Sequence, residues 1–168
     1  MTARTLGIEE ALNIAIEAEL KAQAFYAQAA AWVQDPHGRD LLGRLAAFEQ
    51  HHYQKLTELV RSLQVGGKFI TYEPRTIDQF APLASGETVG ALPEAKQNEA
   101  GILGQAIQME KVAGERYRVL ADETTDPAGQ TMFRRLANEE QVHQRILEDE
   151  FFSLSNQGVW GWSGMYGE

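Results

Sequence analysis

The sequence predicts an all-α protein: an antiparallel four-helix bundle made of two duplicated helical hairpins joined by a long crossover. Apolar residues recur every three to four positions over long stretches, which is the period of an amphipathic helix. Two Asp-Pro pairs interrupt these stretches, and residues 12–56 resemble residues 103–147. Because 168 residues suit one domain of ordinary size, we expect residues 1–168 to form a single bundle domain.

The first predicted hairpin covers about residues 5–64. Leu12 and Ile16 belong to the apolar stripe of its first helix, among many Ala, Glu, Gln and Lys residues with good helix propensity. Asp35-Pro36 then favours a break and a new helix start, because Asp is a common N-cap and proline is tolerated in the first turn. A second helix should follow this break.

The predicted crossover covers about residues 65–94. Glycine and proline residues, from Gly66 to Pro93, recur too often for a helix to continue through this segment. Within it, residues 68–72 are expected to form a short extended stretch that packs along the outside of the bundle. The crossover therefore separates two helical halves.

The second predicted hairpin covers about residues 95–156, with its own break at Asp126-Pro127. An aromatic, glycine-rich tail follows at residues 157–168, and we expect it to dock onto the bundle or onto a second subunit. A partner-recruiting peptide is the alternative interpretation of this tail.

Sliding the chain against itself by 91 positions reveals an internal duplication. Without a gap, 17 of the 45 residues in 12–56 are identical to their counterparts in 103–147, whereas unrelated segments would share about three. The matched pairs include Glu19 with Glu110, Glu49 with Glu140, His52 with His143 and Tyr26 with Tyr117. Each polar residue of interest in one hairpin thus has a twin in the other.

Composition excludes several kinds of site. The chain has no cysteine, so any metal must be held by nitrogen and oxygen ligands. Its formal net charge of −9 argues against nucleic acid and anionic membranes as partners. No apolar run approaches the roughly 20 residues that span a bilayer, and we expect a soluble, cytoplasmic protein. Glycine-rich phosphate loops and Ser-His-Asp sets are also absent from the sequence pattern.

Glutamate and histidine residues with metal-ligand spacing occur once in each hairpin. In Glu49-x-x-His52 and Glu140-x-x-His143 the two side chains lie on one helix face, with Cβ atoms about 5–6 Å apart. One such pair alone is usually a solvated surface pair. Here, however, Glu19 and Glu49 are equally far from the first break, and the second hairpin repeats this, so the side chains should meet at one depth.

Charge balance then favours a two-metal centre. Four buried glutamates without partners would be costly, whereas two divalent cations neutralise them and two imidazoles complete the ligand sets. The predicted ligands are Glu19, Glu49, His52, Glu110, Glu140 and His143.

These motifs, together with Glu19-x6-Tyr26 and Glu110-x6-Tyr117, resemble the rubrerythrin-like branch of the ferritin-like di-iron carboxylate superfamily. The resemblance implies a ferritin-like bundle holding two iron ions, although the ligand types would also accept manganese or zinc. It makes Glu49 and Glu140 the candidate bridging ligands and Glu19 and Glu110 the terminal ones. By the same resemblance Tyr26 and Tyr117 either steady a ligand through their hydroxyls or are ordinary buried tyrosines.

Two features depart from the best-known rubrerythrins. No rubredoxin-like module with four cysteines is present, so electrons must come from a separate donor, such as a rubredoxin or reductase, or from ferrous iron itself. The additional glutamate expected near the third-helix ligand is also missing, since Ile107 and Ala113 lie one turn from Glu110. An exchange of His for Glu at one iron is therefore not expected.

The primary functional hypothesis is a non-haem di-iron redox enzyme, a peroxidase or oxidase that reacts with hydrogen peroxide or dioxygen in oxidative-stress or iron handling. One alternative is a ferroxidase, iron-storage or iron-delivery protein, although a single bundle encloses no mineral cavity. The other is a di-manganese, catalase-like protein, because this ligand set does not select iron over manganese. Bundles of this family commonly pair, so a homodimer is expected.

Overall fold

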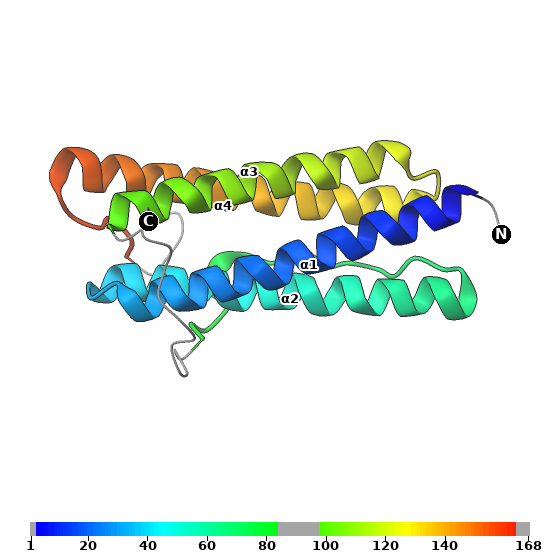
Figure 1. Cartoon of the computed structure of the whole chain (residues 1–168), viewed down its shortest axis with the longest axis horizontal. Helices are drawn as coiled ribbons and strands as arrows, with labels where there is room; N and C mark the ends of the chain where they lie inside the picture. The colour runs from blue at the N-terminus through cyan, green and yellow to red at the C-terminus, as the bar shows by residue number, and fades with distance from the viewer. Residues whose placement is uncertain (1–2, 84–97, 164–168) are drawn as a thin grey trace.

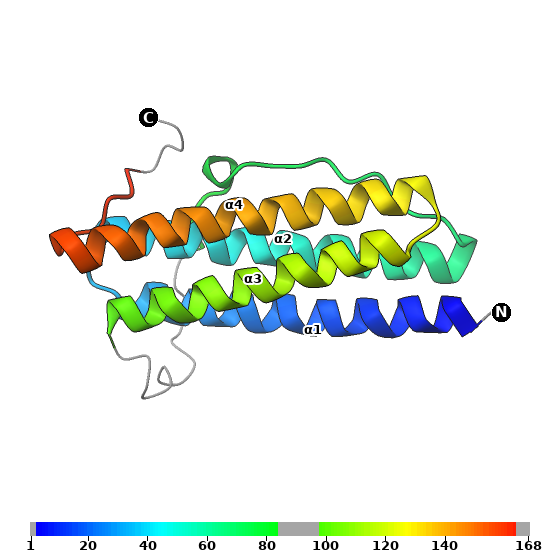
Figure 2. The same cartoon turned by 90° about the horizontal axis from the view of Figure 1, so that it is seen from above.

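The computed structural model describes residues 3–83 and 98–163, and these form a bundle of four long helices in which the crossover returns the chain along the bundle, so that α2 and α3 run in the same direction (Figure 1). In order along the chain they are α1 (Ala3–Trp32), α2 (Pro36–Gly66), α3 (Glu99–Glu123) and α4 (Pro127–Gln157), with one 3₁₀ turn, η1 (Ile77–Gln79), between α2 and α3. Figure 1 and Figure 2 show α1 beside α2 and α3 beside α4, each pair running antiparallel. The all-α, two-hairpin fold class is confirmed.

Both predicted breaks begin a helix in the same way. The Asp35 side chain accepts hydrogen bonds from the backbone N–H groups of His37 and Gly38, and Asp126 accepts one from Ala128. Each is followed by a proline in the first turn, where the missing N–H costs nothing. The duplicated Asp-Pro sequence therefore produces two equivalent turns, which bring each hairpin's helices to matching depth.

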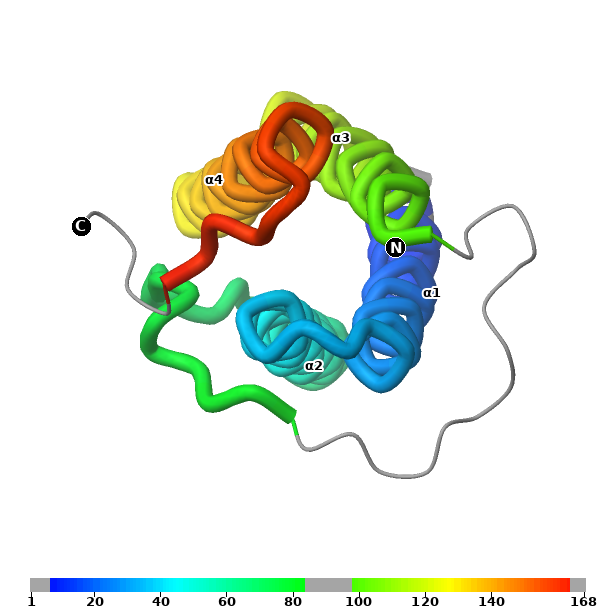
Figure 3. The backbone as a smooth tube through the Cα atoms, turned by 90° about the vertical axis from the view of Figure 1, so that its left-hand side faces the viewer, coloured from blue at the N-terminus to red at the C-terminus, as the bar shows by residue number. Residues whose placement is uncertain are grey.

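Two apolar clusters occupy the two halves of the bundle interior. The first contains Phe25, Leu42 and Leu103, and the second contains Leu12, Leu56 and Phe133; all are buried. Viewed along the bundle, the four helices surround a common interior (Figure 3). The polar residues described below lie between these clusters, so apolar side chains cover them from both ends of the bundle.

The described part of the crossover packs along the outside of the bundle, as predicted, beside α4 in Figure 2. It is irregular apart from η1, and no strand occurs among residues 3–83 and 98–163. Tyr72 turns its side chain into the interior, while its carbonyl accepts a hydrogen bond of 2.6 Å from Arg135. The predicted crossover residues 84–94 lie outside the described residues.

The aromatic tail docks onto its own bundle as far as it is described. Trp160 and Trp162 are buried, and their indole N–H groups donate to Glu99 (2.9 Å) and Asp40 (2.8 Å). At Gly38 an added Cβ would lie only 2.6 Å from Trp160, so this contact requires glycine. The tail thus ties α4 to the starts of α2 and α3; residues 164–168 lie outside the described part.

None of the described helices is long and apolar enough to cross a membrane.

Candidate metal centre

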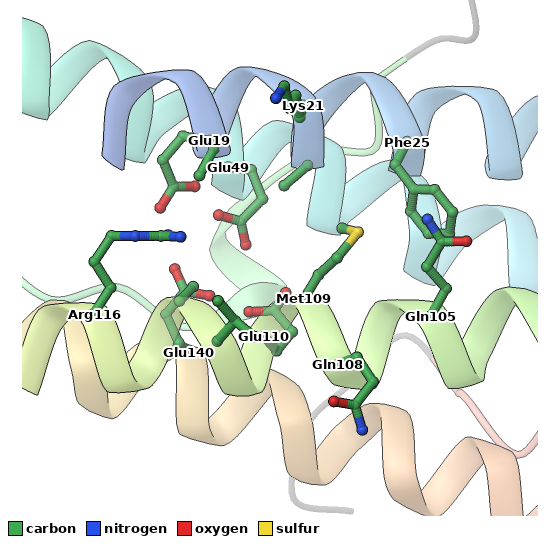
Figure 4. Close-up of a pocket in the computed structure, with 14 residues that line it drawn as sticks. Glu19, Lys21, Phe25, Glu49, Gln105, Gln108, Met109, Glu110, Arg116 and Glu140 are labelled. Atoms are coloured by element: carbon green, nitrogen blue, oxygen red, sulfur yellow. The ribbon is translucent and has the colours of Figure 1, made fainter. Parts of the chain in front are cut away.

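All six predicted ligands converge at mid-bundle. The four helices contribute one or two residues each, and Figure 4 shows the four glutamates directed toward one another from opposite hairpins. None of the six is more than 3 % exposed: Glu19 on α1, Glu49 and His52 on α2, Glu110 on α3, and Glu140 and His143 on α4. Equal spacing from the two Asp-Pro turns brings them to one level.

The ligand atoms form two overlapping groups. The Nδ1 atom of His52 lies 2.8 Å from Glu140, 3.3 Å from Glu49 and 3.5 Å from Glu19. The Nδ1 atom of His143 lies 3.4 Å from Glu49, 3.7 Å from Glu110 and 3.8 Å from Glu140. Within each group the ligand atoms lie within 4.8 Å of one another, and Glu49 and Glu140 belong to both. This sharing is the arrangement that two neighbouring metal ions with bridging carboxylates require.

Most of the nitrogen and oxygen atoms that could bind metal in this cluster have no hydrogen-bond partner. In the part of the chain that the structure describes, seven buried side-chain atoms have no hydrogen-bond partner, and six of them belong to the cluster: Glu49 Oε1, His52 Nδ1, Glu110 Oε2, both carboxylate oxygens of Glu140, and His143 Nδ1. Leaving such atoms buried and unpaired costs about 1–3 kcal/mol each, more for charged groups. Divalent cations would satisfy all of them at once, so the residues present fit a two-metal centre.

The protonation equilibria show the same conflict. Burial, together with repulsion from the neighbouring glutamates, raises the pKa of Glu49 well above its ordinary value. The same two causes raise the pKa of Glu140. Burial works against the charged form of both histidines, yet the surrounding carboxylates raise the pKa of His52 and of His143. Without cations the cluster must therefore hold extra protons, and these are displaced when metal binds.

Two tyrosines cross between the hairpins. The Tyr26 hydroxyl on α1 donates to Glu110 on α3 at 2.6 Å, and the Tyr117 hydroxyl on α3 donates to Glu19 on α1. Both rings are completely buried. Of the two sequence-based interpretations, this geometry fits the one in which a hydroxyl orients a carboxylate, because each tyrosine contacts the glutamate of the opposite hairpin.

Sequence reasoning missed a third polar pair beside His52. The Nε2 atom of His52 lies 3.1 Å from Glu139, whose same oxygen, Oε1, accepts a hydrogen bond from the Tyr72 hydroxyl. The other oxygen of Glu139 accepts from the backbone N–H of Arg75 at 2.9 Å. When Nε2–H donates to the Glu139 carboxylate, the neutral imidazole of His52 presents the lone pair of Nδ1 to the cluster. The only sign of Glu139 in the sequence is that an acidic residue stands directly before Glu140. By itself, such a residue is typical of a solvated charge on the surface.

One cavity of about 430 Å³ opens from the centre between α1 and α3. Four site glutamates, Glu19, Glu49, Glu110 and Glu140, line its inner end, and Phe25, Met109, Arg116 and Lys21 are among the other lining residues. Figure 4 shows Arg116 extending from α3 into the space between Glu19 and Glu140. The centre is therefore buried from the ends of the bundle but reachable from this side.

Comparison with known proteins agrees with this geometry. The family model for rubrerythrin matches residues 101–158. A solved structure of a hypothetical protein from Pyrococcus furiosus is similar over 91% of this chain and 93% of its own, with a TM-score of 0.67 and 25% sequence identity. No curated protein matches the chain in sequence. The rubrerythrin match over residues 101–158, the four-helix bundle and the buried Glu/His cluster together support a rubrerythrin-like, ferritin-like family for this chain.

Proposed function

We propose that this chain is a di-iron redox protein that reduces hydrogen peroxide or dioxygen. The observation that supports this best is the pair of overlapping ligand groups sharing Glu49 and Glu140, with their donor atoms otherwise unpaired. Two iron ions bound there would supply adjacent Lewis-acidic positions and two electrons, enough to convert one peroxide molecule and two protons into water.

The protein's own residues hold and orient the ligand atoms. Glu49 and Glu140 reach both groups and are the proposed bridging ligands, while Glu19 and Glu110 are the proposed terminal ones. Tyr26 and Tyr117 fix one oxygen of each terminal carboxylate. Phe48 packs edge-on against His143 with ring centroids 4.3 Å apart, which keeps water from this side of the imidazole.

The lining of the cavity carries charges of both signs, because Lys21 and Arg116 lie beside the four site glutamates. Arg116 lines the cavity without an ion pair among the described residues, and Lys21 is exposed along the same cavity. A ferroxidase or iron-storage role is the second candidate, supported mainly by the net charge of −9.

Metal analysis tests the centre. Protein purified without chelator should contain close to two transition-metal ions per chain, and the Glu110→Ala, Glu140→Ala double variant should lose them. The matched control is Glu115→Ala, Glu148→Ala, which removes two exposed glutamates from the same helices. Full metal content in the double variant would show that the proposed ligands are wrong. Zinc as the metal in the freshly isolated protein would contradict a redox function, because zinc does not change oxidation state.

Stopped-flow mixing separates the reactions. Rapid oxidation of the ferrous protein by peroxide, with turnover only when an external reductase supplies electrons, is the expected result. Repeated oxidation of added ferrous iron would favour the ferroxidase alternative. Peroxide decay without any reductant would favour a manganese pair.

We also propose a homodimer and a separate electron donor. Sedimentation velocity measures the oligomeric state, and reduction kinetics with purified rubredoxin or reductase measure electron transfer from the donor.

A further inference from the structure

The α1/α3 cavity is much larger than a small oxidant requires. Hydrogen peroxide and dioxygen are similar in size to water, whose share of liquid volume is about 30 Å³, whereas the cavity measures about 430 Å³. That volume falls in the range of roughly 300–1,000 Å³ that holds small organic ligands. Size alone therefore indicates room for an organic molecule beside the carboxylates.

The walls of the cavity are apolar along most of their length. Ala22 and Phe25 on α1 face Met109, Val112 and Ala113 on α3. These α3 residues lie on one helical face with Gln105 and Arg116, because the positions recur every three or four residues. From position 105 to position 116 the helix rises roughly 16 Å, at 1.5 Å per residue. The walls thus suit an elongated apolar chain.

The two ends of the cavity carry polar groups without partners. At one end Arg116 is half-buried and has no hydrogen bond or ion pair among residues 3–83 and 98–163. At the other end the Oε1 atom of Gln105 is buried and likewise has no hydrogen-bond partner. Because Arg116 extends between Glu19 and Glu140 (Figure 4), attraction of an anion to it rests on the proposed function, in which two metal ions neutralise the four glutamates. The unpaired guanidinium beside apolar walls is then complementary to a carboxylate with an alkyl tail.

We propose that this cavity is a binding site for a medium-chain organic carboxylate, with its head group on Arg116 and its tail along Phe25 and Met109. The proposal goes beyond reaction with peroxide or dioxygen, because binding of the carboxylate requires no redox step. The duplication supports a specific role for Arg116: its twin is Phe25, so only one of the two equivalent positions in this cavity carries a charge.

Methionine-methyl NMR gives a readout at the site itself. Met109 lines the cavity, whereas Met132 is buried in the second apolar cluster and serves as an internal reference. Titration of the purified protein with decanoate should shift the Met109 methyl signal in a saturable, one-to-one manner and leave Met132 unchanged. Decanol, which has the same tail without the charge, should bind at least tenfold more weakly. Equal shifts at both methionines, or a shift that does not saturate, would overturn the proposal.

Substitutions then locate the head group. Arg116→Gln should weaken decanoate binding at least tenfold and leave decanol binding unchanged, and Ala22→Leu should weaken both ligands by filling the cavity. The matched control is Arg118→Gln, which removes an exposed arginine, paired with Glu115, from the same helix. Circular dichroism checks that each variant folds.

Two further outcomes would contradict the site. Decanoate affinity that is unchanged in Arg116→Gln, and that disappears after chelation of the metal, would place the carboxylate on the metal ions. A Met109 signal that changes on dilution of the ligand-free protein would show that a second copy of the chain covers the cavity. Because the titration can be performed before and after chelation, failure of the metal centre and failure of this site are distinguishable.

Discussion

The two hairpins supply identical ligands but different surroundings for them. Glu49-x-x-His52 and Glu140-x-x-His143 occupy equivalent positions in α2 and α4. The residue before the first motif is Phe48, whereas its twin before the second is Glu139. Phe48 packs against both imidazoles, at centroid distances of 5.1 Å and 4.3 Å, whereas of the two imidazoles only that of His52 has a hydrogen bond with Glu139 among the described residues.

This difference makes a symmetric ligand set inequivalent. A carboxylate that accepts the imidazole N–H fixes the ring and increases the basicity of the other nitrogen, which typically changes metal affinity by about 10–100-fold. Among the described residues, the carboxylates beside His143 are those of Glu49, Glu110 and Glu140, all near its Nδ1 atom. Duplication therefore preserved the ligands, and divergence at one neighbouring position distinguishes the two metal positions.

The largest effect is expected from the shared carboxylates. Glu49→Ala in the first hairpin and Glu140→Ala in the second should each reduce the metal content from two ions to below one, because each residue belongs to both ligand groups. Metal analysis of the two variants, side by side, measures this. Retention of one full ion by either variant would show that its carboxylate does not bridge.

The aromatic tail is a second difference between the hairpins, because it follows the second hairpin in the chain and packs against the first. It should therefore stabilise the contact between them. Trp160→Ala should lower the free energy of unfolding by about 3–5 kcal/mol, the usual cost of truncating a buried aromatic side chain. Trp32→Ala is the control, since Trp32 is 41% exposed. Chemical denaturation of both variants measures the difference, and equal losses would contradict the buried position of the tail.

Glu139→Gln should separate the two metal positions. Loss of the carboxylate beside His52 is expected to weaken one of the two binding steps by about 10–100-fold and to leave the other nearly unchanged. Competitive titration with a chromophoric chelator resolves the steps. Tyr72→Phe provides a graded comparison, because it keeps Glu139 and removes only the hydroxyl that donates to it. Equal weakening of both steps would mean that the hairpins are energetically equivalent.

The pH dependence should have opposite signs with and without metal. Because Glu49, Glu140 and both histidines have raised pKa values, the metal-free folded state holds more protons than the unfolded state. Its stability should therefore fall as pH rises above the ordinary glutamate pKa of 4.5, by about 1.4 kcal/mol per pH unit for each extra proton. Glu110 contributes in the opposite sense, because hydrogen bonds lower its pKa despite burial.

Metal binding reverses this trend. The ions replace those protons, so affinity should increase with pH, and calorimetry in buffers of different ionisation enthalpy should detect proton release. Proton release that is absent near neutral pH would indicate that the carboxylates are already ionised in the metal-free protein.

Much of the centre could be predicted because its determinants are local and repeated. The Asp-Pro turns set the depth of Glu19 against Glu49 within one hairpin, and the duplication carries the same register into the other. The structure brings all six predicted residues together at that depth. Their role as metal ligands remains the proposal that the metal analysis tests.

Residues whose neighbours depend on the path of an irregular segment could not be found in this way. Tyr72 reaches Glu139 only because the crossover follows α4, and residues 68–72 carry no periodic pattern from which that path could be calculated. Arg116 likewise looks like an ordinary surface arginine until α1 is placed opposite it.

The sequence by itself determined the helices, the hairpins and the level at which six polar side chains meet, because helix period and turn position are properties of adjacent residues. Only the tertiary structure decided how the hairpins face each other, where Trp160 docks, and which imidazole receives a second carboxylate. Those contacts join residues far apart in the chain, and their geometry depends on how the whole interior packs.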